Sequence, residues 1–120
     1  MSKNEELGLP RGAMSLVTIA FDVDGTLLNN EETGIEGLGN PSIITLVVLL
    51  SKMKNVQLIC WSGGGADYAK TIARQLHLTK FFDKYMSKTQ ATMDGFKPDI
   101  AIDDIQDTKL GKVNLIVREK

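Results

Sequence analysis

The feature that most restricts the fold of this chain is an alternation of short, β-branched apolar blocks with blocks of helical periodicity. The strand-like blocks are Leu16–Phe21, Val56–Cys60, Lys84–Ser87, Asp99–Ile102 and Val113–Val117. Helices are expected over 41–54 and 66–76, with one or two helical turns within 90–95 and a loop over 25–40. This alternation predicts an α/β fold, a Rossmann-like three-layer sandwich around a five-stranded, mainly parallel sheet with its last strand near an edge.

Composition limits the chemistry that this fold can perform. The 120 residues suffice for one domain, and 42% hydrophobic and 24% charged residues argue against disorder. A formal net charge of -1 gives no specific signal for nucleic-acid binding. The chain has one cysteine and one histidine, which excludes an internal disulfide and a cysteine or histidine metal cluster. Any chemistry must therefore use carboxylates, hydroxyls, lysines and backbone amides.

The first residues of the chain are polar and contain glycine, and we leave them out of the fold prediction. Residues 1–15 lack the apolar core of a secretory signal, so we expect a flexible leader and a cytoplasmic protein. The single core domain is then 16–120. Apolar runs are too short for a membrane span, so no membrane association is expected.

Chemically useful side chains follow the expected strands at the points where they end. Asp22 and Asp24 follow the first strand, Ser62 the second, Lys88 the third, and Asp103-Asp104 the fourth. In open parallel sheets, ligands bind beyond the carboxyl ends of the strands, so these residues are expected to converge.

The expected carboxylates indicate a metal ion. Taken alone, Asp22 and Asp24 are more typical of a strand followed by an Asx turn than of a functional site. Together with Asp103 and Asp104, however, they would repel one another strongly unless a cation lay among them. Mg²⁺ is the hard, oxygen-liganded ion usually found with substrate phosphate, and we expect it here.

The remaining strand ends suggest an anion site. Ser62 with Gly63 precedes a helix, where free amides bind phosphate, although a serine N-cap in a tight turn has the same pattern. Between two candidate lysines, Lys88 follows a strand, whereas Lys97 precedes one and should lie about 20 Å away at the opposite edge. Lys88 is therefore the expected phosphate-binding cation.

These motifs resemble those of the haloacid dehalogenase-like (HAD) superfamily, most of whose members are Mg²⁺-dependent phosphatases. The segment Phe21-Asp22-Val23-Asp24-Gly25-Thr26-Leu27 is similar to the first motif of that superfamily. Ser62 matches the second motif, Lys88 the third, and Ile102-Asp103-Asp104 the fourth, although Lys88 and Asp103 are unusually close in sequence. The resemblance extends from Leu16 to about Val117.

The resemblance implies a role for each matched residue. Asp22 would be the nucleophile and Asp24 the general acid/base. Mg²⁺ would be held by the Asp22 carboxylate, the Asp24 backbone carbonyl and a carboxylate of Asp103 or Asp104, with Asp107 assisting from outside. The phosphate-binding residues would be Thr26, Ser62, Gly63 and Lys88.

One departure from the superfamily bears on the substrate. Neither 27–40 nor 62–88 is long enough for the usual cap domain, so the chain resembles a minimal, capless member. An open site favours a macromolecular phosphorylated substrate, or a neighbouring subunit that closes it, with a small phosphate ester as the alternative. We expect Glu31, Glu32 and Glu36 on a solvated loop that overhangs the site, and Tyr68 on the apolar stripe of the second helix.

Two other functions are compatible with a domain of this size. A receiver-type phosphoacceptor domain would carry its phosphorylated aspartate after the third strand and a lysine after the fifth. Here the third strand ends at Ser87-Lys88 and the fifth at Val117-Arg118, so that pattern is absent. A catalytically silent binding module of the same fold would bind phosphate or metal without turnover.

Overall fold

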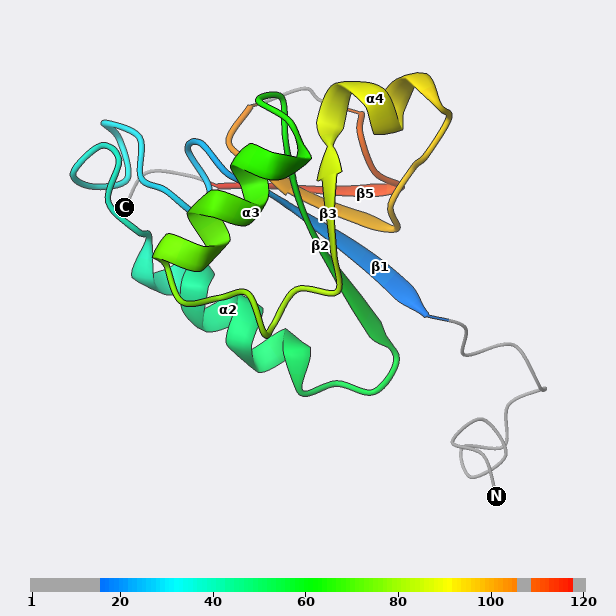
Figure 1. The fold of residues 1–120 in the computed structure, drawn as a ribbon, viewed down its shortest axis with the longest axis horizontal. Helices are drawn as coiled ribbons and strands as arrows, with labels where there is room; N and C mark the ends of the chain where they lie inside the picture. The colour runs from blue at the N-terminus through cyan, green and yellow to red at the C-terminus, as the bar shows by residue number, and fades with distance from the viewer. Residues whose placement is uncertain (1–15, 106–108, 118–120) are drawn as a thin grey trace.

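A five-stranded parallel sheet forms the centre of the molecule (Figure 1). The computed structural model describes residues 16–105 and 109–117. The strand order is β3-β2-β1-β4-β5, and every pairing is parallel. The strands are β1 (Val17–Asp22), β2 (Val56–Ser62), β3 (Lys84–Ser87), β4 (Ile100–Asp103) and β5 (Val113–Ile116). The predicted α/β class and the edge position of the last strand are confirmed; the expected leader, 1–15, lies outside the described residues.

Helices cover both faces of the sheet, as a three-layer sandwich requires. On one face, α2 (Pro41–Ser51) and α3 (Ala66–Gln75) pack over a core that contains Phe21, Leu58 and Ile102. On the other face, α4 (Lys88–Met93) covers a smaller core around Trp61, whose ring meets Phe96 edge-on at 6.1 Å. Because side chains alternate along a strand, neighbouring residues of β1 and β2 belong to different cores.

The helix ends differ from the sequence expectation by a few residues. Asn40 caps α2, because its side chain accepts a hydrogen bond from the backbone N of Ser42 at 3.2 Å. The helix ends at Ser51 instead of residue 54. In contrast, α4 begins at Lys88, two residues before the expected start at residue 90. The Ser87 hydroxyl caps this helix by accepting a hydrogen bond from the backbone N of Gln90. The end of β3 and the start of α4 are therefore adjacent, which places Lys88 at the strand edge.

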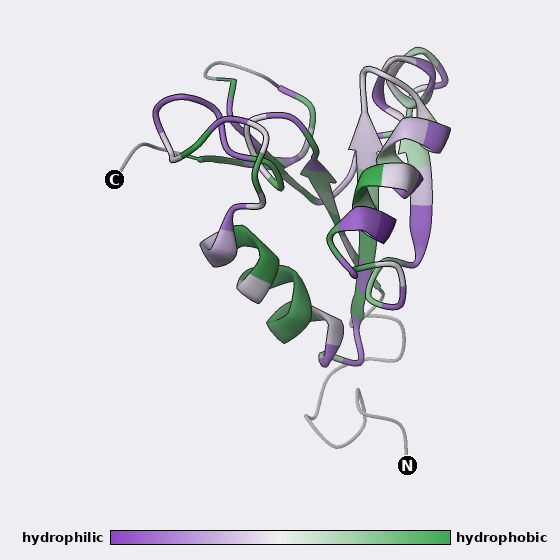
Figure 2. Ribbon diagram, turned by 60° about the vertical axis from the view of Figure 1, so that its left-hand side comes forward, coloured by the Kyte–Doolittle hydropathy of each residue, from purple (hydrophilic) through white to green (hydrophobic). Residues whose placement is uncertain are grey.

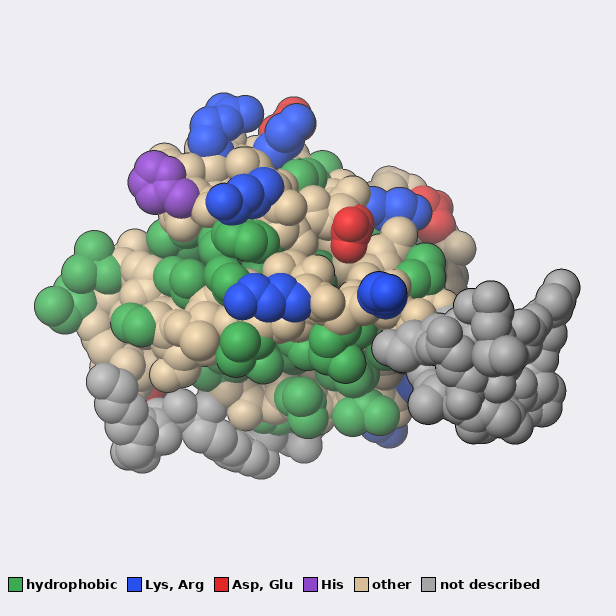
Figure 3. Space-filling model, turned by 90° about the horizontal axis from the view of Figure 1, so that it is seen from below, with side chains coloured by type: hydrophobic (Ala, Val, Ile, Leu, Met, Phe, Trp, Pro, Cys, Tyr) green, Lys and Arg blue, Asp and Glu red, His purple; other side chains and the backbone are tan. Residues whose placement is uncertain are grey.

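The surface is apolar in places and unevenly charged. Figure 2 shows α2 hydrophobic along most of its length, in contrast to the mixed α3. Seen from below, hydrophobic side chains and lysines or arginines predominate and acidic side chains are few (Figure 3). Among the described residues, the structure contains no helix of the length and hydrophobicity needed to cross a membrane.

Candidate functional site

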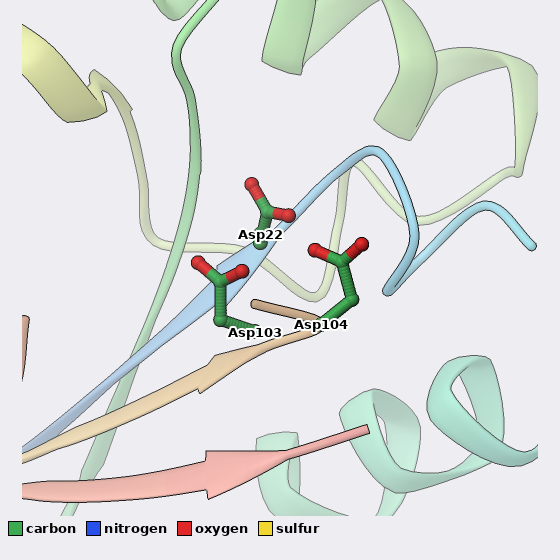
Figure 4. A group of neighbouring side chains, drawn as sticks. All are labelled: Asp22, Asp103 and Asp104. Carbon is green, nitrogen blue, oxygen red and sulfur yellow. The ribbon is translucent and has the colours of Figure 1, made fainter. Parts of the chain in front are cut away.

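Three aspartates meet where β1 and β4 end. Asp22 is the last residue of β1 and Asp103 the last of β4, and the register Phe21↔Ile102 sets these strand ends side by side. Asp104 follows directly. One carboxylate oxygen from each aspartate lies within 4.8 Å of the others, and Figure 4 shows the three side chains grouped at the strand ends. The structure thus brings together three of the four carboxylates that were expected to converge.

Lys88 joins this cluster from the first turn of α4. Its Nζ donates to Asp22 Oδ1 at 3.1 Å and to Asp103 Oδ2 at 2.5 Å. Lys97 is exposed and precedes β4, at the end of the strand opposite to Asp103. The chain therefore supplies Lys88, and not Lys97, as the cation of the cluster.

The carboxylates of the cluster outnumber its one lysine, and their pKa values reflect this. Burial, with the nearby charge of Asp103, raises the pKa of Asp22 to about 7 despite Lys88. Burial and a hydrogen bond with Asp103 also raise the pKa of Asp104. Burial lowers the pKa of Lys88, but its bonds and charge interactions with Asp103 and Asp22 outweigh this, so the net shift is upward. The cluster holds surplus negative charge that a cation would neutralise.

The donor atoms fit a hard divalent cation. Mg²⁺ prefers a few carboxylate oxygens and keeps its other positions for water and phosphate. Asp22, Asp103 and Asp104 offer three such oxygens. Both oxygens of Asp103 also accept hydrogen bonds. Oδ2 accepts from Lys88 Nζ, and Oδ1 accepts from the backbone N of Ile105 at 3.1 Å. Asp107, the further expected contributor, lies outside the described residues.

Gly25 allows Asp104 to approach the end of β1. Its φ is +81°, in the left-handed region that favours glycine. A Cβ at this position would lie 2.0 Å from Asp104 Oδ2. Thus the glycine of the Asp-x-Asp-Gly segment provides both the turn after β1 and the space for the third carboxylate.

Asp24 lies outside the three-aspartate cluster and is oriented by α3. Its side chain is exposed, and its Oδ1 accepts a hydrogen bond from Tyr68 Oη at 2.8 Å. Burial and this bond raise the pKa of Tyr68 to about 12, so the phenol stays a donor at neutral pH. Tyr68 was expected only to pack on the core, which it does with its ring. Its position in the first turn of α3, next to the strand ends, was the sequence signal for this second contact.

The expected phosphate-binding hydroxyls lie below the surface. Ser62 ends β2 and is buried, and its Oγ accepts from the backbone N of Gly64 at 2.9 Å. The N-cap of α3 is Gly65, so the alternative of a serine N-cap is wrong. Thr26 is fully buried, and its hydroxyl has no hydrogen-bond partner among the described residues. Gly63 is exposed at the same edge as Ser62.

No family model matches the sequence, and neither the curated proteins nor the solved structures contain a significant match.

Proposed function

We propose that this protein is a Mg²⁺-dependent phosphohydrolase that cleaves phosphate monoesters through an aspartyl-phosphate, in the manner of the HAD superfamily. The observation that carries the proposal is the meeting of Asp22, Asp103 and Asp104 with Lys88 at the ends of two adjacent strands. A nucleophilic carboxylate, a set of oxygen donors for a hard cation and a fixed ammonium are the groups that phosphoryl transfer needs.

Asp22 is the proposed nucleophile. One oxygen of its carboxylate attacks phosphorus, the bond from phosphorus to the ester oxygen breaks, and the electron pair leaves with that oxygen. Asp24 donates a proton to the leaving oxygen. In the second step Asp24 takes a proton from water, the water oxygen attacks phosphorus, and the acyl-phosphate bond breaks to release inorganic phosphate and Asp22. Tyr68 supports this role because it fixes the direction of the Asp24 carboxylate.

Mg²⁺ would be held by Asp22, by Asp103 or Asp104, and by the Asp24 backbone carbonyl. When bound, it supplies positive charge that neutralises the phosphoryl oxygens and lowers the repulsion between them and the nucleophile. Lys88 would move its hydrogen bonds from the carboxylates to a phosphoryl oxygen. Ser62, Gly63 and Thr26 remain the proposed source of further phosphate contacts, for which the buried hydroxyls of Ser62 and Thr26 would have to become accessible.

The setting of the reaction is proposed from the sequence alone. We place the enzyme in the cytoplasm, acting on a phosphorylated substrate at a site without a cap domain. The absence of a cap is compatible with a macromolecular substrate or with a second subunit beside the site.

The test is hydrolysis of 4-nitrophenyl phosphate by the full chain, with Mg²⁺ and with EDTA. Asp22→Asn is the test variant, and Asp94→Asn, an exposed acid at the end of α4, is the matched control. We expect turnover that requires Mg²⁺, is lost in Asp22→Asn and is kept in Asp94→Asn. Turnover in Asp22→Asn would contradict the nucleophile assignment.

The same experiment separates the two alternative functions. A receiver-type domain would accept a phosphoryl group from a small donor without repeated turnover. A silent binding module would show binding of Mg²⁺ or phosphate with no product. The hydrogen bond from Tyr68 to Asp24 supports the hydrolase over both, because it orients the proposed acid/base, which neither alternative needs.

A further inference from the structure

We infer that the site accepts small phosphate monoesters whose leaving group carries a positive charge. This inference rests on the proposed function and adds the substrate class. It depends on a cavity beside Asp24, on the groups that line it and on the distribution of charge around it.

A cavity of about 360 Å³ opens next to Asp24 and reaches Asp104 of the three-aspartate cluster. This volume lies within the range of small-molecule sites. Because Asp24 is the proposed proton donor to the leaving oxygen, the cavity beside it is where the leaving group would lie. Its lining residues are Asp24, Gly25, Leu28, Asn29, Asn30, Glu36, Gly37, Tyr68 and Asp104.

Hydrogen bonds within the loop hold the wall of the cavity in place. The backbone N of Asn29 donates to Leu38 O at 2.7 Å, and that of Asn40 donates to Leu27 O at 2.8 Å. Thr33 Oγ1 donates to Asn29 Oδ1 at 3.1 Å, and the Asn30 side chain accepts from two backbone amides of the same loop. This loop therefore walls the site on one side, as part of a cap would.

Among the described residues that line the cavity, the charged side chains are all acidic. They are Asp24, Glu36 and Asp104, and none of the described lining residues is a lysine or an arginine. A second hollow of about 400 Å³ shares Glu36 and Asp104 and adds Glu31 and Glu32. Lysine and arginine side chains lie instead on the face seen in Figure 3, where acidic side chains are few.

This pattern discriminates between leaving groups. Lys88 and a bound cation serve the phosphoryl group, whereas the leaving group would meet carboxylates and neutral amides. Further phosphates or carboxylates on the substrate would be repelled, and an ammonium would be attracted, because partly enclosed charges are screened less than exposed ones. A polyanionic macromolecule, such as a nucleic-acid end, is correspondingly disfavoured.

The test compares two esters of the same shape, phosphocholine and 3,3-dimethylbutyl phosphate, which differ in a cationic nitrogen against a neutral carbon. We expect kcat/KM to favour phosphocholine by roughly tenfold at low salt. The preference should shrink in Glu36→Gln, an exposed loop position, and persist in Asp94→Asn, which lines neither hollow.

Equal rates for the two esters, or a preference for the neutral one, would overturn the inference while leaving the phosphohydrolase intact. Hydrolysis of 4-nitrophenyl phosphate with neither small ester cleaved would also overturn it, in favour of a macromolecular substrate. Loss of all phosphatase activity is a different result, because it would remove the proposed function and this inference with it.

Discussion

At the scale of single residues, the site concentrates negative charge in a place where burial disfavours it. Asp22 and Asp103 are buried, and Lys88 provides the one ammonium that the described residues bring to them. Such an arrangement costs stability in the metal-free protein, because desolvated carboxylates repel one another. Buried ionisable groups with perturbed pKa values cluster at functional sites, which makes these aspartates candidates for a functional role.

The first prediction concerns Asp22 and pH in the metal-free protein. Because burial and Asp103 raise its pKa from 3.8 to about 7, the folded state holds this proton more tightly than the unfolded chain. The resulting stability is full below the unfolded pKa and is lost as the pH rises through about 7. We expect Asp22→Asn to flatten this dependence and to raise the free energy of unfolding at pH 8 by on the order of 1–3 kcal/mol.

Urea unfolding in EDTA at pH 5 and pH 8 measures this effect, with Asp94→Asn as the control that should leave it unchanged. An Asp22→Asn protein less stable than the native chain at pH 8 would show that Asp22 is a stabilising ion pair rather than a strained nucleophile.

The second prediction separates two lysines. Lys88→Ala removes the ammonium that bonds Asp22 and Asp103, and we expect kcat/KM for an aryl phosphate to fall by roughly 10²-fold or more. Lys97→Ala, on an exposed residue before β4, should change it less than twofold in steady-state assays, within the small effects typical of surface substitutions. The reverse ranking would mean that phosphate is bound elsewhere.

These residues differ in how far the sequence alone could place them. Asp22, Lys88 and Asp103 were predictable because each is at the end of a parallel strand, and such ends share an edge. The contact of Tyr68 with Asp24 was missed, although its place in the first turn of α3 was a signal, because the ring also fits the apolar stripe of that helix. Asn29 and Asn30 belong to a loop whose path depends on tertiary hydrogen bonds, which leave no periodic signal.

At the scale of elements, the connections between strands and helices position the candidate site. The turn after β1 brings Asp104 against Gly25, and the short β3–α4 junction delivers Lys88. Periodicity predicted which segments are strands and which are helices, but it did not predict where they end. Capping by Ser87 starts α4 two residues earlier than expected, and β2 extends to Ser62 instead of ending at Cys60. These boundary differences matter, since a helix that began two residues later would not present Lys88 from its first turn.

The third prediction tests the turn. Gly25→Ala places a Cβ 2.0 Å from Asp104 Oδ2 at a φ of +81°, so we expect it to displace that carboxylate and to raise the Mg²⁺ concentration needed for half-maximal activity. Gly95→Ala is the matched control, because φ there is +82° and the added Cβ would meet nothing within 4 Å. Both should lose about 1–2 kcal/mol of stability from backbone strain.

Titration of activity with Mg²⁺, beside thermal unfolding, distinguishes the two effects of the substitution. A Gly25→Ala protein with the same Mg²⁺ requirement as Gly95→Ala would contradict the placement of Asp104 in the metal site.

At the scale of the whole molecule, the parallel sheet explains why the candidate site residues lie at one edge. Parallel strands deliver all their carboxyl ends to the same side, and β1, in the middle of the order β3-β2-β1-β4-β5, has neighbours on both sides that can contribute. The alternating sequence was sufficient to predict the fold class, the parallel sheet and the edge at which the strand-end aspartates meet. It was not sufficient for the cavity beside Asp24, which depends on how 25–40 folds back on itself.

The most direct test of the central claim is to locate the covalent phosphoryl group. Asp24→Asn should slow hydrolysis of the intermediate, so an acid quench after mixing with 4-nitrophenyl phosphate and Mg²⁺ should trap it. Borohydride reduction converts an aspartyl-phosphate to homoserine, which peptide mass spectrometry assigns to a position. We predict homoserine at position 22 with Mg²⁺ and none with EDTA. Homoserine at Asp103 or Asp104, or turnover with no residue labelled, would contradict it.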